Sequence, residues 1–249
     1  MNANREIYAD IDQFPGDNGA GFFNVLAFRG VFFGSPFAKS NRYQWFNTLD
    51  EWEAFRKAEK KKATKNGTRP EEEYYVKKNC YGQNQTDHSI KLLPNYWEQR
   101  LLWGQYFNTP SKPSITEVYK WLTSSVKVGR STITLFCNIG ALTALLICGD
   151  LIEAKILDMP TTHEWGGLIH SLNMGAKSAM FRLGMTKENA SKIEVANAFT
   201  SLNLALRQEL KEEEKEAMDY NAVMLEHVLC KIKRLISQGV SLEKITKEI

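Results

Sequence analysis

The amino-acid sequence predicts a mainly α-helical fold, with a helical core domain over residues 113–249. Residues 48–51, 114–117 and 161–164 match the Ser/Thr-x-x-Glu capping box, in which a hydroxyl and a carboxylate satisfy the free N–H groups at a helix start. The core domain contains only two prolines, Pro113 and Pro160. Its apolar residues recur at the i, i+3, i+4, i+7 spacing that places them on one face of a helix.

Composition divides the chain into three regions. Residues 1–40 form an N-terminal arm, residues 41–112 an aromatic and basic region of helix and loop, and residues 113–249 the helical domain. The arm is rich in Gly and Phe, which predicts short β pieces separated by turns.

The phenylalanines of the arm raise the main functional question. Seven of the thirteen in the chain lie between Phe14 and Phe37. Each carries about 150–250 Å² of surface that must leave water, so this chain or another chain must cover them. We expect the arm to mediate subunit association through Phe14, Phe22, Phe23, Phe28, Phe32, Phe33 and Phe37.

The first helix starts follow from the capping boxes. A box at residues 48–51 opens a charged helix that extends to about Lys65, and a box at residues 114–117 opens the next helix. The stretch 132–157 is apolar on nearly all sides, which predicts a buried central helix.

Further helices are expected in the last third of the chain. A box at residues 161–164 opens a helix whose apolar stripe extends from Trp165 to Leu183. Residues 188–249 predict two amphipathic helices separated by an acidic, solvated turn at residues 212–219. Thr186 and Ser241 are candidates for further caps.

The positive charge is concentrated in the middle region. Residues 1–40 carry three Lys/Arg against four Asp/Glu, residues 41–112 carry thirteen against nine, and residues 113–249 carry sixteen of each. The excess of +3 therefore arises from the aromatic and basic region, which indicates a surface for an anionic partner.

Aromatic residues alternate with cations in this middle region, a combination typical of single-stranded nucleic-acid binding. Cations contact phosphates, and flat rings stack on bases. The alternative is a solvated helix and loop, since several Glu residues dilute the charge and some rings have core spacing. The candidate binding residues are Arg42, Arg56, Lys57, Lys60, Lys61, Lys62, Lys65, Arg69, Tyr74, Tyr75, Lys77, Lys78 and Arg100.

Only one pattern suggests catalysis. Asp150, Glu153 and Lys155 are similar in type and spacing to the carboxylates and lysine of metal-dependent nucleases. Glu153 and Lys155 would share a face only on a strand, whereas the preceding residues favour a helix. We therefore expect no enzyme activity, and neither a metal site nor a cofactor.

The remaining signals concern the cellular compartment. The four cysteines, Cys80, Cys137, Cys148 and Cys230, are widely spaced, which indicates reduced thiols. The N-terminal residues do not resemble a signal peptide, and no apolar stretch is long enough for a membrane span. The expected location is the cytoplasm, the nucleus or a virion.

These observations favour a self-assembling structural protein that binds single-stranded RNA without sequence specificity. A nucleocapsid or coat subunit combines exchanged arms, repeated weak contacts and a sequence-neutral groove for nucleic acid. The alternatives are a helical adaptor or regulatory module, whose Phe-rich segment folds against its own core, and the metal-dependent nuclease.

Overall fold

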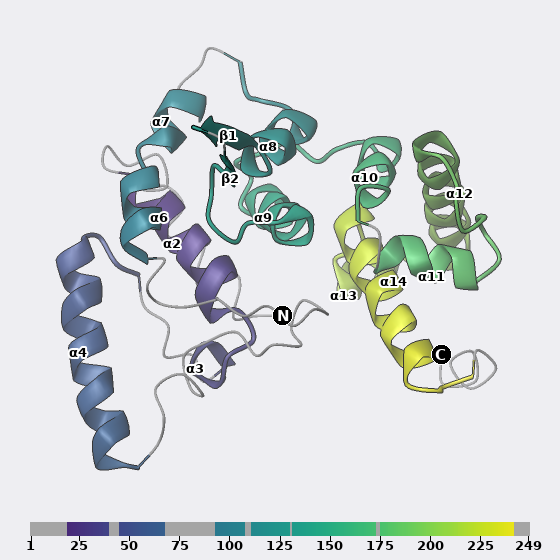
Figure 1. Ribbon diagram of the computed structural model, residues 1–249. Helices are drawn as coiled ribbons and strands as arrows, with labels where there is room; N and C mark the ends of the chain where they lie inside the picture. The colour runs from purple at the N-terminus through teal and green to yellow at the C-terminus, as the bar shows by residue number, and fades with distance from the viewer. Residues whose placement is uncertain are drawn as a thin grey trace. The chain divides into compact units, whose positions relative to one another are not determined.

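The computed structural model describes residues 19–39, 45–67, 93–107, 111–129, 131–172 and 175–241. The prediction of a mainly helical fold is confirmed: the described residues form helices and a single two-stranded sheet (Figure 1). The chain divides into two compact units, Met1–Asp158 and Met159–Ile249. This division differs from the predicted boundary at residue 113.

The first unit begins with continuous helical structure. Helix α2 (Ala20–Ala27) continues directly into a π-helix, η2 (Phe28–Phe32), and α3 (Pro36–Lys39) follows. Every residue of α2 and η2 is buried. The expected β pieces are therefore not formed within residues 19–39, because an almost unbroken apolar run here forms a helix buried on all sides.

The capping boxes of the first unit begin helices where the sequence predicts them. Helix α4 (Leu49–Lys65) starts after Thr48, whose hydroxyl accepts a hydrogen bond from the Glu51 N–H at 3.1 Å. Helices α6 (Leu93–Gln99) and α7 (Leu102–Phe107) precede α8 (Ile115–Leu122), which the capping box of Ser114 and Glu117 opens.

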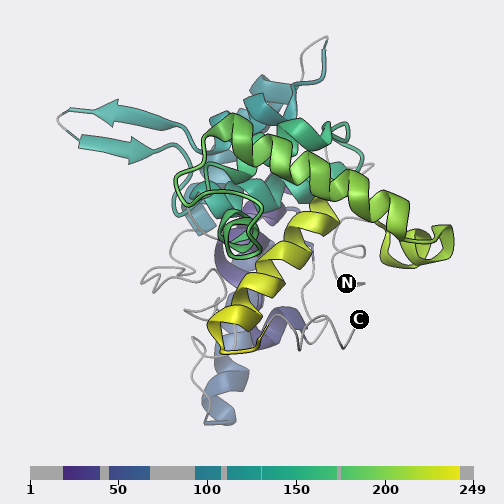
Figure 2. The same cartoon turned by 90° about the vertical axis from the view of Figure 1, so that its right-hand side faces the viewer.

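The predicted central helix is shorter than residues 132–157. Strands β1 (Ser125–Val128) and β2 (Ser131–Thr134) pair antiparallel, with Val126 opposite Ile133, in a hairpin that extends from its unit (Figure 2). Helix α9 (Ala141–Glu153) begins only after Gly140. The β-branched residues before it form the second strand instead of a first helical turn.

Long-range contacts explain why the first unit extends to residue 158. The buried ring of Phe22 lies 5.4 Å from the Trp121 ring and 5.5 Å from the Phe136 ring, measured between centroids. The side chain of Asn24 donates a hydrogen bond to the Phe46 carbonyl at 2.9 Å and accepts one from the Phe46 N–H at 3.1 Å. The Phe-rich segment therefore shares one core with α8 and Phe136, which lie after residue 113 in the same unit.

The second unit contains five helices among its described residues: α10 (Thr162–Ile169), α11 (Ala176–Arg182), α12 (Lys192–Glu209), α13 (Glu212–Met218) and α14 (Ala222–Ser237). The predicted helix from Trp165 to Leu183 is two helices, and Gly175 starts the second with a φ of 71°. The two amphipathic helices are confirmed as α12 and α14. The predicted acidic turn is instead the short exposed helix α13. Three of its glutamates lie in the first turn, where the positive end of the helix dipole stabilises negative charge.

A close helix contact builds the core of the second unit. At Gly166 on α10, an added Cβ would lie 2.9 Å from the Cα of Ala196 on α12, so glycine permits the approach. Trp165, Val195 and Phe199 are buried beside this contact.

In the part of the chain that the structure describes, no helix combines the length and apolarity that a membrane crossing needs.

Candidate nucleic-acid interface

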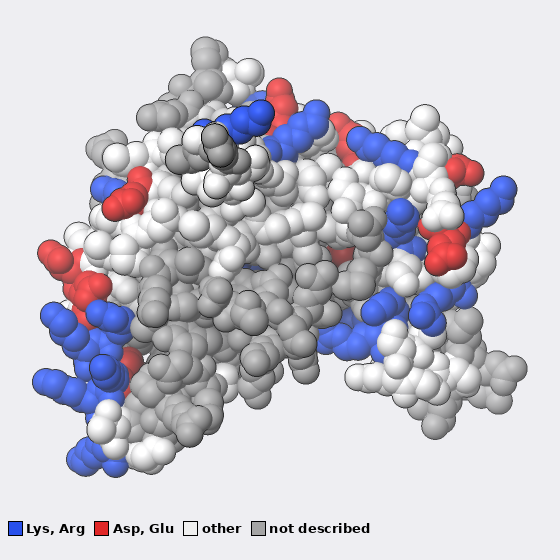
Figure 3. Space-filling view, in the orientation of Figure 1, with Lys and Arg blue, Asp and Glu red and all other residues white. Residues whose placement is uncertain are grey.

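Helix α4 presents the described part of the predicted binding surface. Its six cations are all exposed: Arg56, Lys57, Lys60, Lys61, Lys62 and Lys65. Trp52 and Glu59 are buried on the side of the helix opposite Lys57, Lys61 and Lys65. Figure 3 shows acidic atoms at the N-terminal end of α4 and basic atoms along the rest of it. This order also suits the helix dipole, which favours acids at the start and bases at the end.

Three of the lysines form one outward row. Lys57, Lys61 and Lys65 follow each other at i, i+4 spacing, about 6 Å apart along the axis. In contrast, Lys62 pairs with Glu59 at 2.7 Å, and Arg56 pairs with Glu53 at 3.0 Å. Like charges at i, i+4 destabilise a helix, so an anionic ligand along this row would stabilise it.

The structure does not place Arg100 on this row. Its guanidinium lies 4.0 Å from the centre of the Trp97 ring, and its Nη1 donates a hydrogen bond to the Trp97 carbonyl at 2.6 Å. Arg100 is half-buried and holds the end of α6. The remaining predicted binding residues lie outside the described residues: Arg42, Arg69, Tyr74, Tyr75, Lys77 and Lys78.

The described phenylalanines of the arm lie inside the first unit. Phe22, Phe23, Phe28, Phe32 and Phe37 are buried, Phe33 is half-buried, and Phe14 lies outside the described residues. This is the arrangement expected if the Phe-rich segment folds against its own core. These five buried rings can contact a neighbouring subunit only if the segment leaves that core.

Two stacked ring pairs at α7 were not identified from the sequence. The rings of Trp103 and Phe107 stack at 3.7 Å with an interplanar angle of 14°, and those of Tyr106 and Trp121 at 4.4 Å and 10°. Trp103 is buried, whereas Tyr106, Phe107 and Trp121 are half-exposed. The i, i+4 spacing of Trp103 and Phe107 could have indicated one pair, but the other pair joins separate helices.

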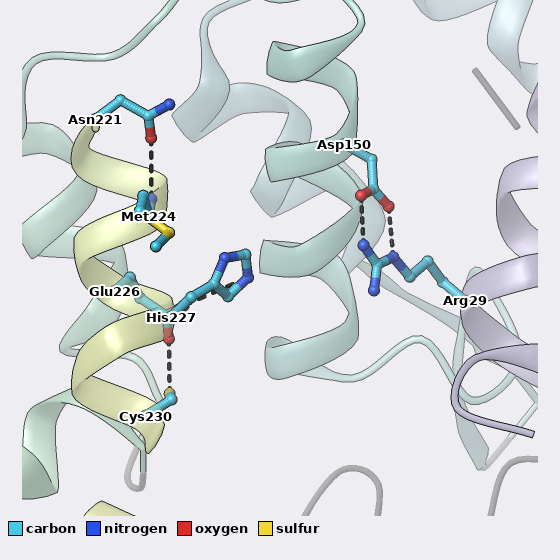
Figure 4. A network of polar contacts seen from close by, with 7 residues as sticks. All are labelled: Arg29, Asp150, Asn221, Met224, Glu226, His227 and Cys230. Atoms are coloured by element: carbon cyan, nitrogen blue, oxygen red, sulfur yellow. Dashed lines mark hydrogen bonds and ion pairs between the residues drawn. The ribbon is translucent and has the colours of Figure 1, made fainter. Parts of the chain in front are cut away.

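The residues of the suggested nuclease pattern are not brought together. The carboxylate of Asp150 on α9 accepts two hydrogen bonds from the guanidinium of Arg29 on η2, and both side chains are buried (Figure 4). Glu153 is exposed, and Lys155 follows the helix with a left-handed φ of 60°. Among the described residues, no group of three or more His, Cys, Asp or Glu side chains is placed to hold a metal ion.

A buried carboxyl group lies on α14. Glu226 accepts a hydrogen bond from the Cys230 thiol at 3.0 Å, and the Nε2 atom of His227 lies 3.9 Å from its other oxygen (Figure 4). Burial raises the pKa of Glu226 to about 6, and the thiol hydrogen bond opposes this shift. Burial also raises the pKa of Cys230, which is therefore a neutral thiol.

No protein-family model, curated protein or solved structure matches this chain. The described surface offers a row of flexible cations on α4 and flat, half-exposed rings on α7.

Proposed function

We propose that the protein is a non-enzymatic structural protein that binds single-stranded RNA without sequence specificity and self-assembles, as nucleocapsid or coat subunits do. The observation that carries the proposal is the outward row of Lys57, Lys61 and Lys65 on α4. Phosphates bound along this row would relieve the repulsion between neighbouring ammonium groups.

The side chains of the row suit a sequence-neutral site. Lysine is a compact charge on a flexible stem, so it contacts phosphates without reading the edges of bases. Within the described residues, no carboxylate pairs with Lys57, Lys61 or Lys65. Their release of counterions on binding would therefore make the affinity for RNA depend strongly on salt.

The buried phenylalanines favour a second candidate function. Five described rings of the arm lie in the core of the first unit, as expected for a helical adaptor or regulatory module. Size measurement with and without nuclease treatment separates the two functions. Large particles that contain nucleic acid support the structural RNA-binding protein, and a small species free of nucleic acid supports the adaptor.

A triple substitution tests the row on α4 directly. Replacing Lys57, Lys61 and Lys65 by Ala should weaken binding of a ten-nucleotide uridine RNA and reduce its salt slope by about 0.7 for each lost phosphate contact. The matched control removes three exposed cations from the second unit, by replacing Lys187, Lys231 and Arg234 with Ala. An unchanged slope in the α4 variant, or an equal change in the control, would contradict the proposal.

A further inference from the structure

We propose that Tyr106 and Phe107 form a platform on which bases of single-stranded RNA stack. The inference rests on the proposed function. It assigns the base contacts to these two rings, whereas the proposed function assigns the phosphate contacts to the lysine row on α4. Both groups belong to the first unit.

The two rings are the outer members of aromatic stacks that start in the core. The buried Phe22 ring lies 5.4 Å from Trp121, nearly parallel to it, and Trp121 stacks on Tyr106 at 4.4 Å. Phe22 also lies 5.0 Å from Trp103, which stacks on Phe107 at 3.7 Å. The inner face of each outer ring is therefore already held by a tryptophan.

This support makes the outer rings suitable for bases. Tyr106 and Phe107 are half-exposed, and their centroids lie 5.5 Å apart at an angle of 63°. Because tryptophans hold both rings, binding a base requires little further loss of side-chain freedom. Stacking on an aromatic ring tolerates every base, as a sequence-neutral protein requires.

The charges beside the rings are compatible with RNA. Glu117 on α8 is near enough to raise the pKa of Tyr106, after the larger effect of burial. The exposed Lys120 on the same helix interacts with Glu117 and offsets its charge. The Tyr106 phenol is therefore neutral at pH 7, with no charge of its own to repel a phosphate.

Two ligands of equal charge separate stacking from charge attraction. A ten-nucleotide uridine RNA carries phosphates and bases, whereas an abasic strand of the same length carries the phosphates alone. Replacing Tyr106 or Phe107 by Leu should weaken binding of the uridine RNA roughly 5- to 100-fold and leave its salt slope and the binding of the abasic strand unchanged. Tyr106→Phe should retain the affinity, and Phe181→Leu, at an exposed ring of the second unit, is the matched control.

The outcomes distinguish this inference from the proposed function. If the wild-type protein binds the uridine RNA with the expected salt slope but both Leu variants bind it equally well, the platform is wrong and the RNA-binding function stands. If the Leu variants lose both ligands equally, the platform is also wrong. If the wild-type protein binds neither ligand, the proposed function fails, and this inference fails with it.

A second measurement avoids dependence on variant folding. Photocrosslinking of wild-type protein to an RNA that contains 4-thiouridine should modify Tyr106 or Phe107, as located by mass spectrometry. Crosslinks found only at other residues would overturn the platform.

Discussion

Different kinds of contact stabilise the core of each unit. The first unit packs large aromatic rings from distant segments, including Phe22, Phe32, Phe46, Trp52, Tyr96, Trp103 and Phe136. The second unit packs mostly aliphatic and small side chains, with Trp165 and Phe199 as its fully buried large aromatics among the described residues. The first unit thus depends on contacts across the chain, and the second on neighbouring helices that approach closely.

One buried carboxyl group in each unit illustrates this difference. In the first unit, Arg29 and Asp150 are 121 residues apart in sequence, and the Arg29 guanidinium also lies 4.4 Å from the centre of the Phe33 ring. In the second unit, Glu226 and its thiol partner Cys230 are one turn apart on the same helix. The Arg29–Asp150 pair therefore links distant segments of the first unit, whereas the Glu226–Cys230 contact of the second unit is local.

The largest loss of stability is expected when the long-range Arg29–Asp150 contact is broken. Arg29→Met leaves the Asp150 carboxylate buried without its cation, which should lower the free energy of unfolding of the first unit by about 3–5 kcal/mol. Urea unfolding followed by tryptophan fluorescence measures this, because five of the six tryptophans lie in residues 1–158.

The control for this variant removes both charges together. The double variant Arg29→Met with Asp150→Leu should be more stable than Arg29→Met alone, since no uncompensated charge remains buried. A single variant as stable as the wild-type protein would show that the ion pair does not hold the first unit together.

A smaller effect of opposite sign is expected at Glu226. Its pKa in the folded protein is raised from 4.5 to about 6, so the folded state favours the neutral carboxyl. The contribution of Glu226 to the free energy of unfolding should therefore make the second unit more stable below pH 4.5 than above pH 6. Glu226→Gln should remove this dependence and raise the free energy of unfolding at pH 7 by about 2 kcal/mol.

Urea unfolding at pH 5 and at pH 7.5, followed through circular dichroism, tests this expectation. Glu188→Gln is the matched control, because Glu188 is an exposed carboxyl of the same unit. If Glu226→Gln destabilises the protein at both pH values, burial of the charged carboxylate is not the cost that the raised pKa of Glu226 implies.

The sequence predicted the local features of both units well. The starts of α4, α8 and α10 lie at their capping boxes, since a cap depends on four consecutive residues. The exposed cations of α4 were also predictable from charge and helical spacing. A fourth box, at Ser191 and Glu194, opens α12, whereas Thr186 caps no helix in the structure.

Features that depend on contacts between distant residues were not predictable in this way. The apolar stripe that starts at Trp165 continues across the break before Gly175, so spacing alone predicted one helix. The division at residue 158 depends on rings such as Phe22 and Trp121 meeting in space. For the same reason, the sequence indicated aromatic residues near the cations but could not show that Tyr106 and Phe107 are the half-exposed ends of stacks among the described rings.

The smallest effect is expected when a helix cap is removed. It tests whether caps stabilise the two units equally. Ser191→Ala removes the hydroxyl that accepts the Glu194 N–H, and Thr48→Ala removes the equivalent hydroxyl of α4. Each substitution should lower the free energy of unfolding of its own unit by about 1 kcal/mol, because a cap stabilises only the first helical turn. Hydrogen bonds from the Ser191 backbone N–H, which the variant keeps, and from its hydroxyl, which the variant loses, lower the pKa of Glu194. The hydroxyl's part of this stabilisation is present at neutral pH and is lost as the pH falls through that lowered pKa. The difference between Ser191→Ala and the wild-type protein should therefore narrow in acid, as measured by urea unfolding at pH 7 and pH 3. A much larger loss for one cap than for the other would mean that the units differ in their local signals as well as in their long-range packing.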